Sequence, residues 1–350
     1  TSLLLVLLLC GVFTAVGIAM VPGMLRLMAT PADVFPQAAR YLRIYFAGVS
    51  GLMLYNLGAG ILRAVGDSKR PFYFLVAAAV LNIGLDLLLV IVFHMGVEGV
   101  AYATIISQGV SALLTLLLLV RTSSCVKLDW RALRATPFIL KQIARVGIPA
   151  ALQMAITAFS NVFVQSYINF FQADCMSGWT AYTKIDQIMF LPMQSLALAA
   201  TTFVGQNYGA GRLDRVKKGT WVTLAMGLVY TLATGALLLL GQDAIMHLFT
   251  NDETVVFFGE AAMHWFCPFY FLLSILHGLA GAVRGTGASV PPMVVLLVSL
   301  CLFRIVWIQW VLPLFSGIEG VFILYPVSWA LGAGLMILYA WKGKWMEYHA

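Results

Sequence analysis

An amide and a carboxylate stand four residues apart inside one long apolar run of the sequence. Asn82 and Asp86 both fall within the stretch 72–94. Residues four apart share one face of a helix, so the two side chains can converge on one small cation or share one proton. We interpret Asn82 and Asp86 as a cation- or proton-coupling site, with Na⁺ as the metal ion that it would hold. The alternative is structural: a buried aspartate tied to neighbouring hydroxyl groups that links helices.

Three further ionisable residues, Lys184, Asp186 and Arg304, also lie inside apolar runs. A charged group is costly in hydrocarbon, so each is a candidate polar residue of a transport chamber. Lys184 and Asp186 are two apart and point to different faces of a helix, so we do not expect them to pair with each other. For Arg304, the alternative is a structural ion pair with Asp186 or another acid.

The remaining reactive residues form no recognisable catalytic pattern. The five cysteines are isolated, which argues against a structural zinc site and a disulfide framework. The sequence contains no HExxH, GxGxxG or P-loop pattern. We therefore expect a protein that is not an enzyme and that holds no cofactor, with Na⁺ or H⁺ as a coupling ion only.

Composition places these residues in a membrane. The chain of 350 residues is 61% hydrophobic and 10% charged, with a mean hydropathy of +0.93. So few charges cannot cover a soluble globule, and the apolar runs are long enough to span a bilayer. Ten spans are predicted, at about 2–28, 38–62, 72–94, 97–120, 143–171, 179–205, 218–247, 256–282, 289–313 and 318–341.

An internal repeat divides these spans into two groups. Residues 60–71 (GILRAVGDSKRP) recur loosely at 281–292 (GAVRGTGASVPP), and 96–100 (GVEGV) recur at 317–321 (GIEGV). The second copy, from residue 143, has six spans, whereas the first has four. We therefore expect an all-α polytopic membrane protein of two parallel six-helix lobes, the first represented here by four helices and lacking its first two. Such repeats are typical of secondary transporters.

Basic residues predict the orientation of the chain. They concentrate between residues 121 and 145, at 212–218 and at 342–344, which are on one side of the predicted topology. That side is cytoplasmic by the positive-inside rule. The predicted organisation is an N-lobe remainder (1–121), a basic cytoplasmic linker (122–142) and a C-lobe (143–350) with a cytoplasmic C-terminus. The net charge of +7 is then a signal of topology, and we expect no nucleic acid partner.

Several ordered motifs resemble the multidrug and toxic compound extrusion (MATE) family. They are GILRAVGDSKRP (60–71), NIGLD (82–86), GVEGVAYATIISQ (96–108), WTAY (179–182), KID (184–186) and TTFVGQNYGA (201–210). The resemblance covers nearly the whole chain. It implies twelve helices in two lobes, an inner-membrane location in a prokaryote, and antiport of small organic cationic or amphipathic substrates against Na⁺ or H⁺. We expect a monomer in the lipid bilayer.

The resemblance also bears on the candidate site. Asn82 and Asp86 match the amide and carboxylate that one branch of the family carries on its fifth helix, as part of an N-lobe cation site. Another branch uses C-lobe acids, but the matching stretches here, 153–161 and 271–277, contain none. The resemblance thus favours the N-lobe site. A lipid-linked oligosaccharide flippase of the same superfamily is the alternative function, and the cationic Lys184 and Arg304 would suit it.

Overall fold

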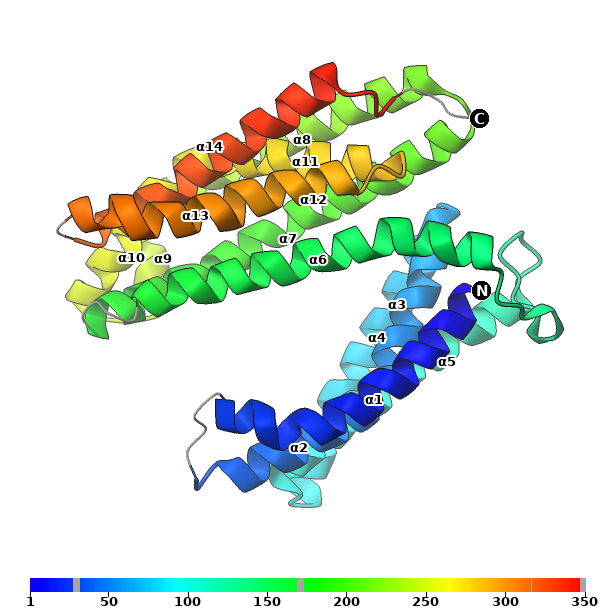
Figure 1. The fold of residues 1–350 in the computed structure, drawn as a ribbon. Helices are drawn as coiled ribbons and strands as arrows, with labels where there is room; N and C mark the ends of the chain where they lie inside the picture. The colour runs from blue at the N-terminus through cyan, green and yellow to red at the C-terminus, as the bar shows by residue number, and fades with distance from the viewer. Residues whose placement is uncertain (28–31, 169–172, 316, 347–350) are drawn as a thin grey trace. The chain divides into compact units, whose positions relative to one another are not determined.

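The computed structural model describes residues 1–27, 32–168, 173–315 and 317–346. Its contacts divide the chain into two compact units, Thr1–Ile143 and Ala144–Ala350, which we call the N-lobe and the C-lobe (Figure 1). The ends of the predicted spans 2–28 and 143–171, and the last four residues of the C-terminus, lie outside the described residues.

The N-lobe is built from helices that follow the predicted spans. They are α1 (Ser2–Leu27), α2 (Phe35–Ala47), α3 (Val49–Ala64), α4 (Lys69–Asp86) with a π-helical continuation η1 (Leu87–Val92), and α5 (Gly96–Arg121). Helices α2 and α3 form one span that bends by 42°. The bend lies at Gly48, where a Cβ atom would overlap the side chain of Ile105 on α5. The missing side chain therefore lets the bent span approach α5 closely.

The basic linker folds back onto the N-lobe. The backbone N–H of Leu128 donates to the carbonyl of Leu119 at 2.8 Å, and the hydroxyl of Thr1 donates to the carbonyl of Arg134 at 2.8 Å. Residues 122–136 contain one short 3₁₀ turn, η2 (Trp130–Ala132). The next helix begins at Pro137, six residues before the predicted start of a span at 143, because proline is well tolerated in the first turn of a helix.

The C-lobe holds the longer helices. They are α6 (Pro137–Ile168, entered from the linker), α7 (Ala173–Gly209), α8 (Leu213–Leu240), α9 (Gln242–His247), α10 (Glu253–Phe266) and α11 (Tyr270–Gly285), then α12 (Val290–Leu297), α13 (Phe303–Val306) and α14 (Glu319–Lys342). Over the described residues, nine helices are long and apolar enough to cross a membrane, and the bent α2–α3 pair makes a tenth. The number of predicted spans is thus confirmed, but the span predicted at 218–247 ends at Leu240, and Gln242–His247 form the separate short helix α9.

The repeat extends to irregular backbone. Gly66 and Gly287, which are equivalent in the two copies, turn the chain with φ angles of +89° and +88°. The π-helical segment η1 has its counterpart in η5 (Trp307–Val311), at nearly the equivalent place. A φ near +90° favours glycine, which explains why this residue recurs between two otherwise loosely similar helices. Short π-helical segments in α-helices are frequent at functional sites, so the end of α4 becomes of interest.

Aromatic side chains form the centre of the C-lobe. Phe266, Tyr270 and Phe322 are each about 1% exposed, and Trp179 and Trp329 are each 5% exposed. Phe266 lies 5.8 Å from Trp329 and 5.7 Å from Phe322 between ring centroids. These rings bring α7, α10, α11 and α14 together, and the functional side chains of the C-lobe are arranged around them.

Candidate functional site

Asn82 and Asp86 lie one turn apart near the end of α4. They are on the side of this helix that packs against the rest of the N-lobe. Both are partly buried, in line with the buried Ala78, whereas Ile83 and Leu87 beside them are exposed. Among the described residues, neither the Nδ2 atom of Asn82 nor the Oδ1 atom of Asp86 has a hydrogen-bond partner, although both atoms are buried. The structural alternative, an aspartate tied to hydroxyl groups, has no support at this oxygen.

The backbone changes its hydrogen-bonding pattern directly after this pair. Asp86 is the last α-helical residue of α4, and the π-helical segment η1 begins directly after it. A π-helical turn shifts the register of the residues that follow, so it changes which side chains continue the face that carries Asp86. The pair therefore stands where a regular helix ends and a less regular one begins.

Asp186 belongs to a second group of polar residues, inside the C-lobe. Its Oδ1 atom accepts hydrogen bonds from the hydroxyls of Tyr182, at 3.2 Å, and Tyr270, at 2.8 Å. The two hydroxyls are themselves 2.8 Å apart. Tyr182 is one turn before Asp186 on α7, whereas Tyr270 is the first residue of α11. The carboxylate is thus fixed between two helices.

Arg304 is buried, with 3% of its surface exposed, and its contacts are uncharged. Its Nε donates to the hydroxyl of Ser328 at 3.3 Å and its Nη1 donates to Oδ1 of Asn161 at 3.4 Å. The guanidinium lies 4.4 Å from the ring centroid of Tyr325. Within the described part of the chain, Arg304 forms no ion pair with Asp186 or with another acid, so the structural ion pair that we considered is not found there.

The Asp186 and Arg304 groups border the same aromatic cluster. The ring of Phe266 lies 5.0 Å from Tyr182, a partner of Asp186, and 5.1 Å from Tyr325, which lies under Arg304. Trp179 contacts the same two tyrosines at 5.7 Å and 5.6 Å. Packed rings therefore connect the carboxylate to the guanidinium, although the two charges do not touch.

Lys184 lies on the opposite side of α7 from this cluster. It is exposed, whereas its neighbour Ile185 is buried and Asp186 is partly buried. As expected for residues two apart, Lys184 and Asp186 face different surroundings. Of the sequence-predicted residues, Asn82 and Asp86 are thus brought together as a pair, Asp186 and Arg304 border one aromatic cluster without touching, and Lys184 stands apart.

Sequence reasoning missed the neutral partners of the buried charges. Tyr182 could have been found, because it precedes Asp186 by one helical turn. Tyr270, Asn161 and Ser328 come from other helices, and no spacing in the sequence connects them to Asp186 or Arg304. Glu260 was also missed; it is partly buried, two turns into α10.

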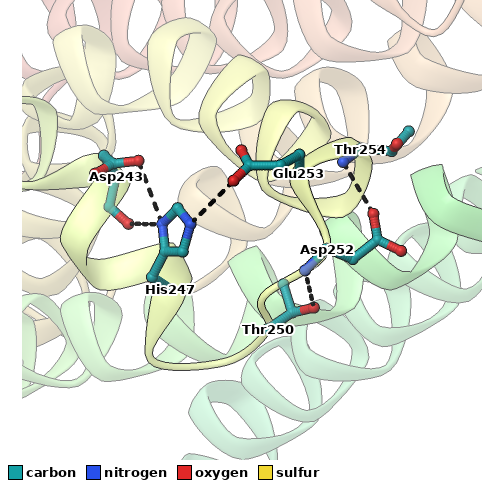
Figure 2. Close-up of polar contacts among 6 residues, drawn as sticks. All are labelled: Asp243, His247, Thr250, Asp252, Glu253 and Thr254. Carbon is teal, nitrogen blue, oxygen red and sulfur yellow. Dashed lines mark hydrogen bonds and ion pairs between the residues drawn. The ribbon is translucent and has the colours of Figure 1, made fainter.

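A further group of titratable residues lies at the turn between α9 and α10: Asp243 and His247 are outside the spanning segments, and Glu253 is the first residue of one (Figure 2). Nδ1 of His247 is 2.9 Å from the carbonyl oxygen of Asp243 and 3.2 Å from its carboxylate, and Nε2 is 3.7 Å from Oε1 of Glu253. The hydrogen bond to the Asp243 carbonyl, followed by the two carboxylates, raises the pKa of His247 above 6.5. The ring therefore links α9 to α10 most strongly when it is protonated.

Comparison with known proteins gives consistent matches. The family model MatE matches residues 1–88 and 149–309. The probable multidrug resistance protein YpnP of Bacillus subtilis is 31% identical over 345 residues, which are 95% of this chain and 74% of that protein. The probable multidrug resistance protein NorM of Thermotoga maritima is 25% identical and covers 95% of this chain and 75% of its own length. A crystal structure of MATE in the bent conformation has a TM-score of 0.91 at 24% identity, over 97% of this chain and 75% of its own.

Proposed function

The chain belongs to the MatE family of multidrug transporters, and on that premise we propose that it is a secondary antiporter that exports small organic cationic or amphipathic compounds in exchange for Na⁺ or H⁺. Its membership in a family of transporters, together with its spanning helices, means that it is a membrane protein and not an enzyme. The named relatives are multidrug resistance proteins, and they lend no support to the flippase alternative.

The observation that carries the coupling proposal is the unsatisfied Asn82–Asp86 pair. A buried carboxylate oxygen and a buried amide without partners are costly, and native proteins retain few of them without a reason. Carboxylate and amide oxygens suit hard cations such as Na⁺, and the carboxylate can equally carry a proton. The Asp86 carboxylate oxygen therefore fits a small cation or a proton, whereas the unpartnered atom of Asn82 is the amide nitrogen Nδ2, so Asn82 would have to turn its amide oxygen toward a bound cation.

Antiport follows if the cation and the substrate favour different conformations. A ligand shifts an equilibrium only by its difference in affinity for the two states, and the effect of one ligand on the other is reciprocal. In the proposed cycle, a cation at Asp86 favours release of the exported compound, and binding of that compound lowers the affinity for the cation. Alternating access of the two halves is the mechanism usual for transporters with such repeats.

The cellular setting is part of the same proposal. We place the protein in the plasma membrane of a prokaryote as a monomer, with the basic linker and the C-terminus in the cytoplasm. The coupling ion would be its one inorganic ligand.

A reconstituted assay tests the proposal. The purified protein is inserted into liposomes, and ethidium movement is followed under an imposed Na⁺ gradient, an imposed pH gradient, or neither. We expect one gradient to accelerate dye transport against its concentration difference. Transport that never exceeds equilibration under either gradient would overturn antiport, and the absence of any dye transport would overturn the proposed substrate class.

A further inference from the structure

Helix α7 has one buried face and one exposed face, and the exposed face carries only polar side chains between Ser177 and Gln187. Ser177, Thr180, Lys184 and Gln187 follow one another along it at spacings of three and four, and Gln194 and Ser195 lie about two turns further on, beyond the exposed Ile188 and Leu191. The six polar residues are all exposed, and we call the surface that they form the α7 polar stripe. The opposite face of the helix, with Trp179, Tyr182 and Met193, is buried in the C-lobe.

The exposed face of α8 provides a comparison within the same lobe. From residue 221 onward its exposed side chains are apolar, and they include Trp221 (74% exposed), Val229 (69%) and Leu240 (90%). Such a surface suits contact with lipid tails. A face of the same depth that carries lysine and glutamine does not, because these groups lose their hydrogen bonds to water in hydrocarbon.

Three residues carry the argument. The hydroxyls of Thr180 and Ser195 donate to backbone carbonyls four residues earlier, so they are satisfied even against lipid. For Lys184, Gln187 and Gln194 no such hydrogen bond exists within the described residues. Lys184 is nine residues after Cys175, the first residue of a candidate span of 35 residues, so its Cα lies about 14 Å along that segment at 1.5 Å per residue. Against lipid tails these three side chains would lack hydrogen-bond partners, so we take the α7 polar stripe to border water.

The charge of the stripe indicates what it binds. Lys184 supplies an ammonium group, and the stripe contains no acid. The nearest acid on α7 is Asp186, which lies toward the other face with its Oδ1 atom between two tyrosine hydroxyls. Two glutamine side chains add hydrogen-bond donors. We propose that the α7 polar stripe binds the anionic group of a transported amphipathic compound, with Lys184 as the charged contact; the substrate role rests on the proposed efflux function.

Cysteine modification tests the surface without any need for transport. In a Cys125→Ser background, which removes the one exposed cysteine of the described chain, single cysteines are placed at Gln187, at Gln194 and, as a control facing lipid, at Val229. Each is treated with an anionic (sulfonatoethyl) and a cationic (trimethylammonioethyl) methanethiosulfonate. We expect both reagents to modify positions 187 and 194, but not 229. Lack of modification at 187 and 194 would assign the stripe to lipid and overturn the proposal.

The ratio of the two rates measures the local charge. At Gln187→Cys, one turn from Lys184, adding Lys184→Gln should lower the rate of the anionic reagent relative to the cationic one by about fivefold, as expected for one charge near a water-exposed site. Lys184→Arg should preserve the ratio. An unchanged ratio in Lys184→Gln would show that Lys184 sets no local potential.

A pair of dyes tests whether the α7 polar stripe binds an anionic group. Rhodamine 110 carries a free carboxylate, and rhodamine 123 is its methyl ester, so the two differ at one charge. In the purified protein, Lys184→Gln should weaken binding of rhodamine 110 relative to rhodamine 123 by about fivefold, whereas Lys217→Gln at the start of α8 should leave the ratio unchanged. Equal loss for both dyes, or no loss for either, would overturn the anionic subsite. Modification of the cysteines at positions 187 and 194 requires no transport. The result of that experiment therefore stands even if the efflux proposal fails.

Discussion

The hydroxyl of Tyr270 donates a 2.8 Å hydrogen bond to the carboxylate of Asp186, which lies 84 residues earlier in the chain. The bond joins the start of α11 to the first half of α7. Tyr182 donates to the same oxygen from α7 itself, at 3.2 Å. Two hydroxyl donors on one carboxylate oxygen fix Asp186 in place, and this favours a structural role within the C-lobe over free exchange of ions with water.

This relationship predicts that Tyr270→Phe lowers the stability of the protein. The substitution keeps the ring and removes the hydroxyl, so the partly buried carboxylate loses a donor at a cost of about 1–3 kcal/mol. Thermal unfolding of the purified protein in detergent measures the loss as a lower midpoint. Tyr73→Phe is the matched control, because Tyr73 is 62% exposed. Equal midpoints for Tyr270→Phe and the unsubstituted protein would contradict the prediction.

A second prediction concerns the buried Arg304. Asn161→Leu removes an acceptor from Nη1 of the guanidinium and should lower stability by about 1–3 kcal/mol. Arg304→Met removes the charge together with its need for acceptors, so the double variant should be more stable than the sum of the two single losses predicts. A double-mutant cycle of unfolding midpoints checks this. Simple additivity would mean that Asn161 and Arg304 act independently.

A third prediction follows from His247 (Figure 2). Its pKa is raised in the folded protein, above 6.5, chiefly by the bond to the carbonyl of Asp243. The stabilising contribution is therefore fully present below pH 6.5 and is lost as the pH rises through the folded-state pKa. Amide hydrogen exchange at the α9–α10 turn, corrected for intrinsic rates, should show more protection at pH 6 than at pH 8. His247→Gln should abolish this difference, and Glu253→Gln should reduce it.

Much of this fold could be predicted from the sequence because apolar length and repetition are local signals. Arg63 and Arg284 hold the same place in the two repeat copies. The helices on either side of them can be predicted from the apolar runs that recur around each arginine. The equivalent Gly66 and Gly287 even share a positive φ. The π-helical segments after Asp86 and around Arg304 could not be predicted, because a change of hydrogen-bond register leaves no pattern in apolar residues.

The candidate site was predictable only in part, for a related reason. Asn82 and Asp86 are one turn apart, so their pairing is a property of one helix. The partners of Arg304 come from α6 and α14, and those of Asp186 include Tyr270 on α11. Such contacts depend on how helices pack. Neutral tyrosine, serine and asparagine are also common in membrane helices, so their presence in the sequence does not mark them as partners of a charged group.

A fourth prediction tests the orientation. A single cysteine at Arg131, in the 3₁₀ turn of the basic linker, should react with an impermeant maleimide only after the cytoplasmic side of the membrane is exposed, because basic residues concentrate in this segment. Arg131 is exposed, so its reactivity reports on the side of the membrane and not on burial. Modification in intact cells would reverse the predicted topology.

The fifth prediction concerns coupling at Asp86. Asp86→Asn preserves the shape of the side chain but removes its charge, so it should abolish gradient-driven dye export while leaving the unfolding midpoint within a few degrees of the original value. Asn82→Ala should reduce export less, since it removes one neutral ligand and leaves the carboxylate. The rates are measured in proteoliposomes under the gradient that drives the unsubstituted protein. Export at the original rate and with unchanged ion dependence in Asp86→Asn would assign Asp86 to helix packing and would overturn the coupling role proposed for it.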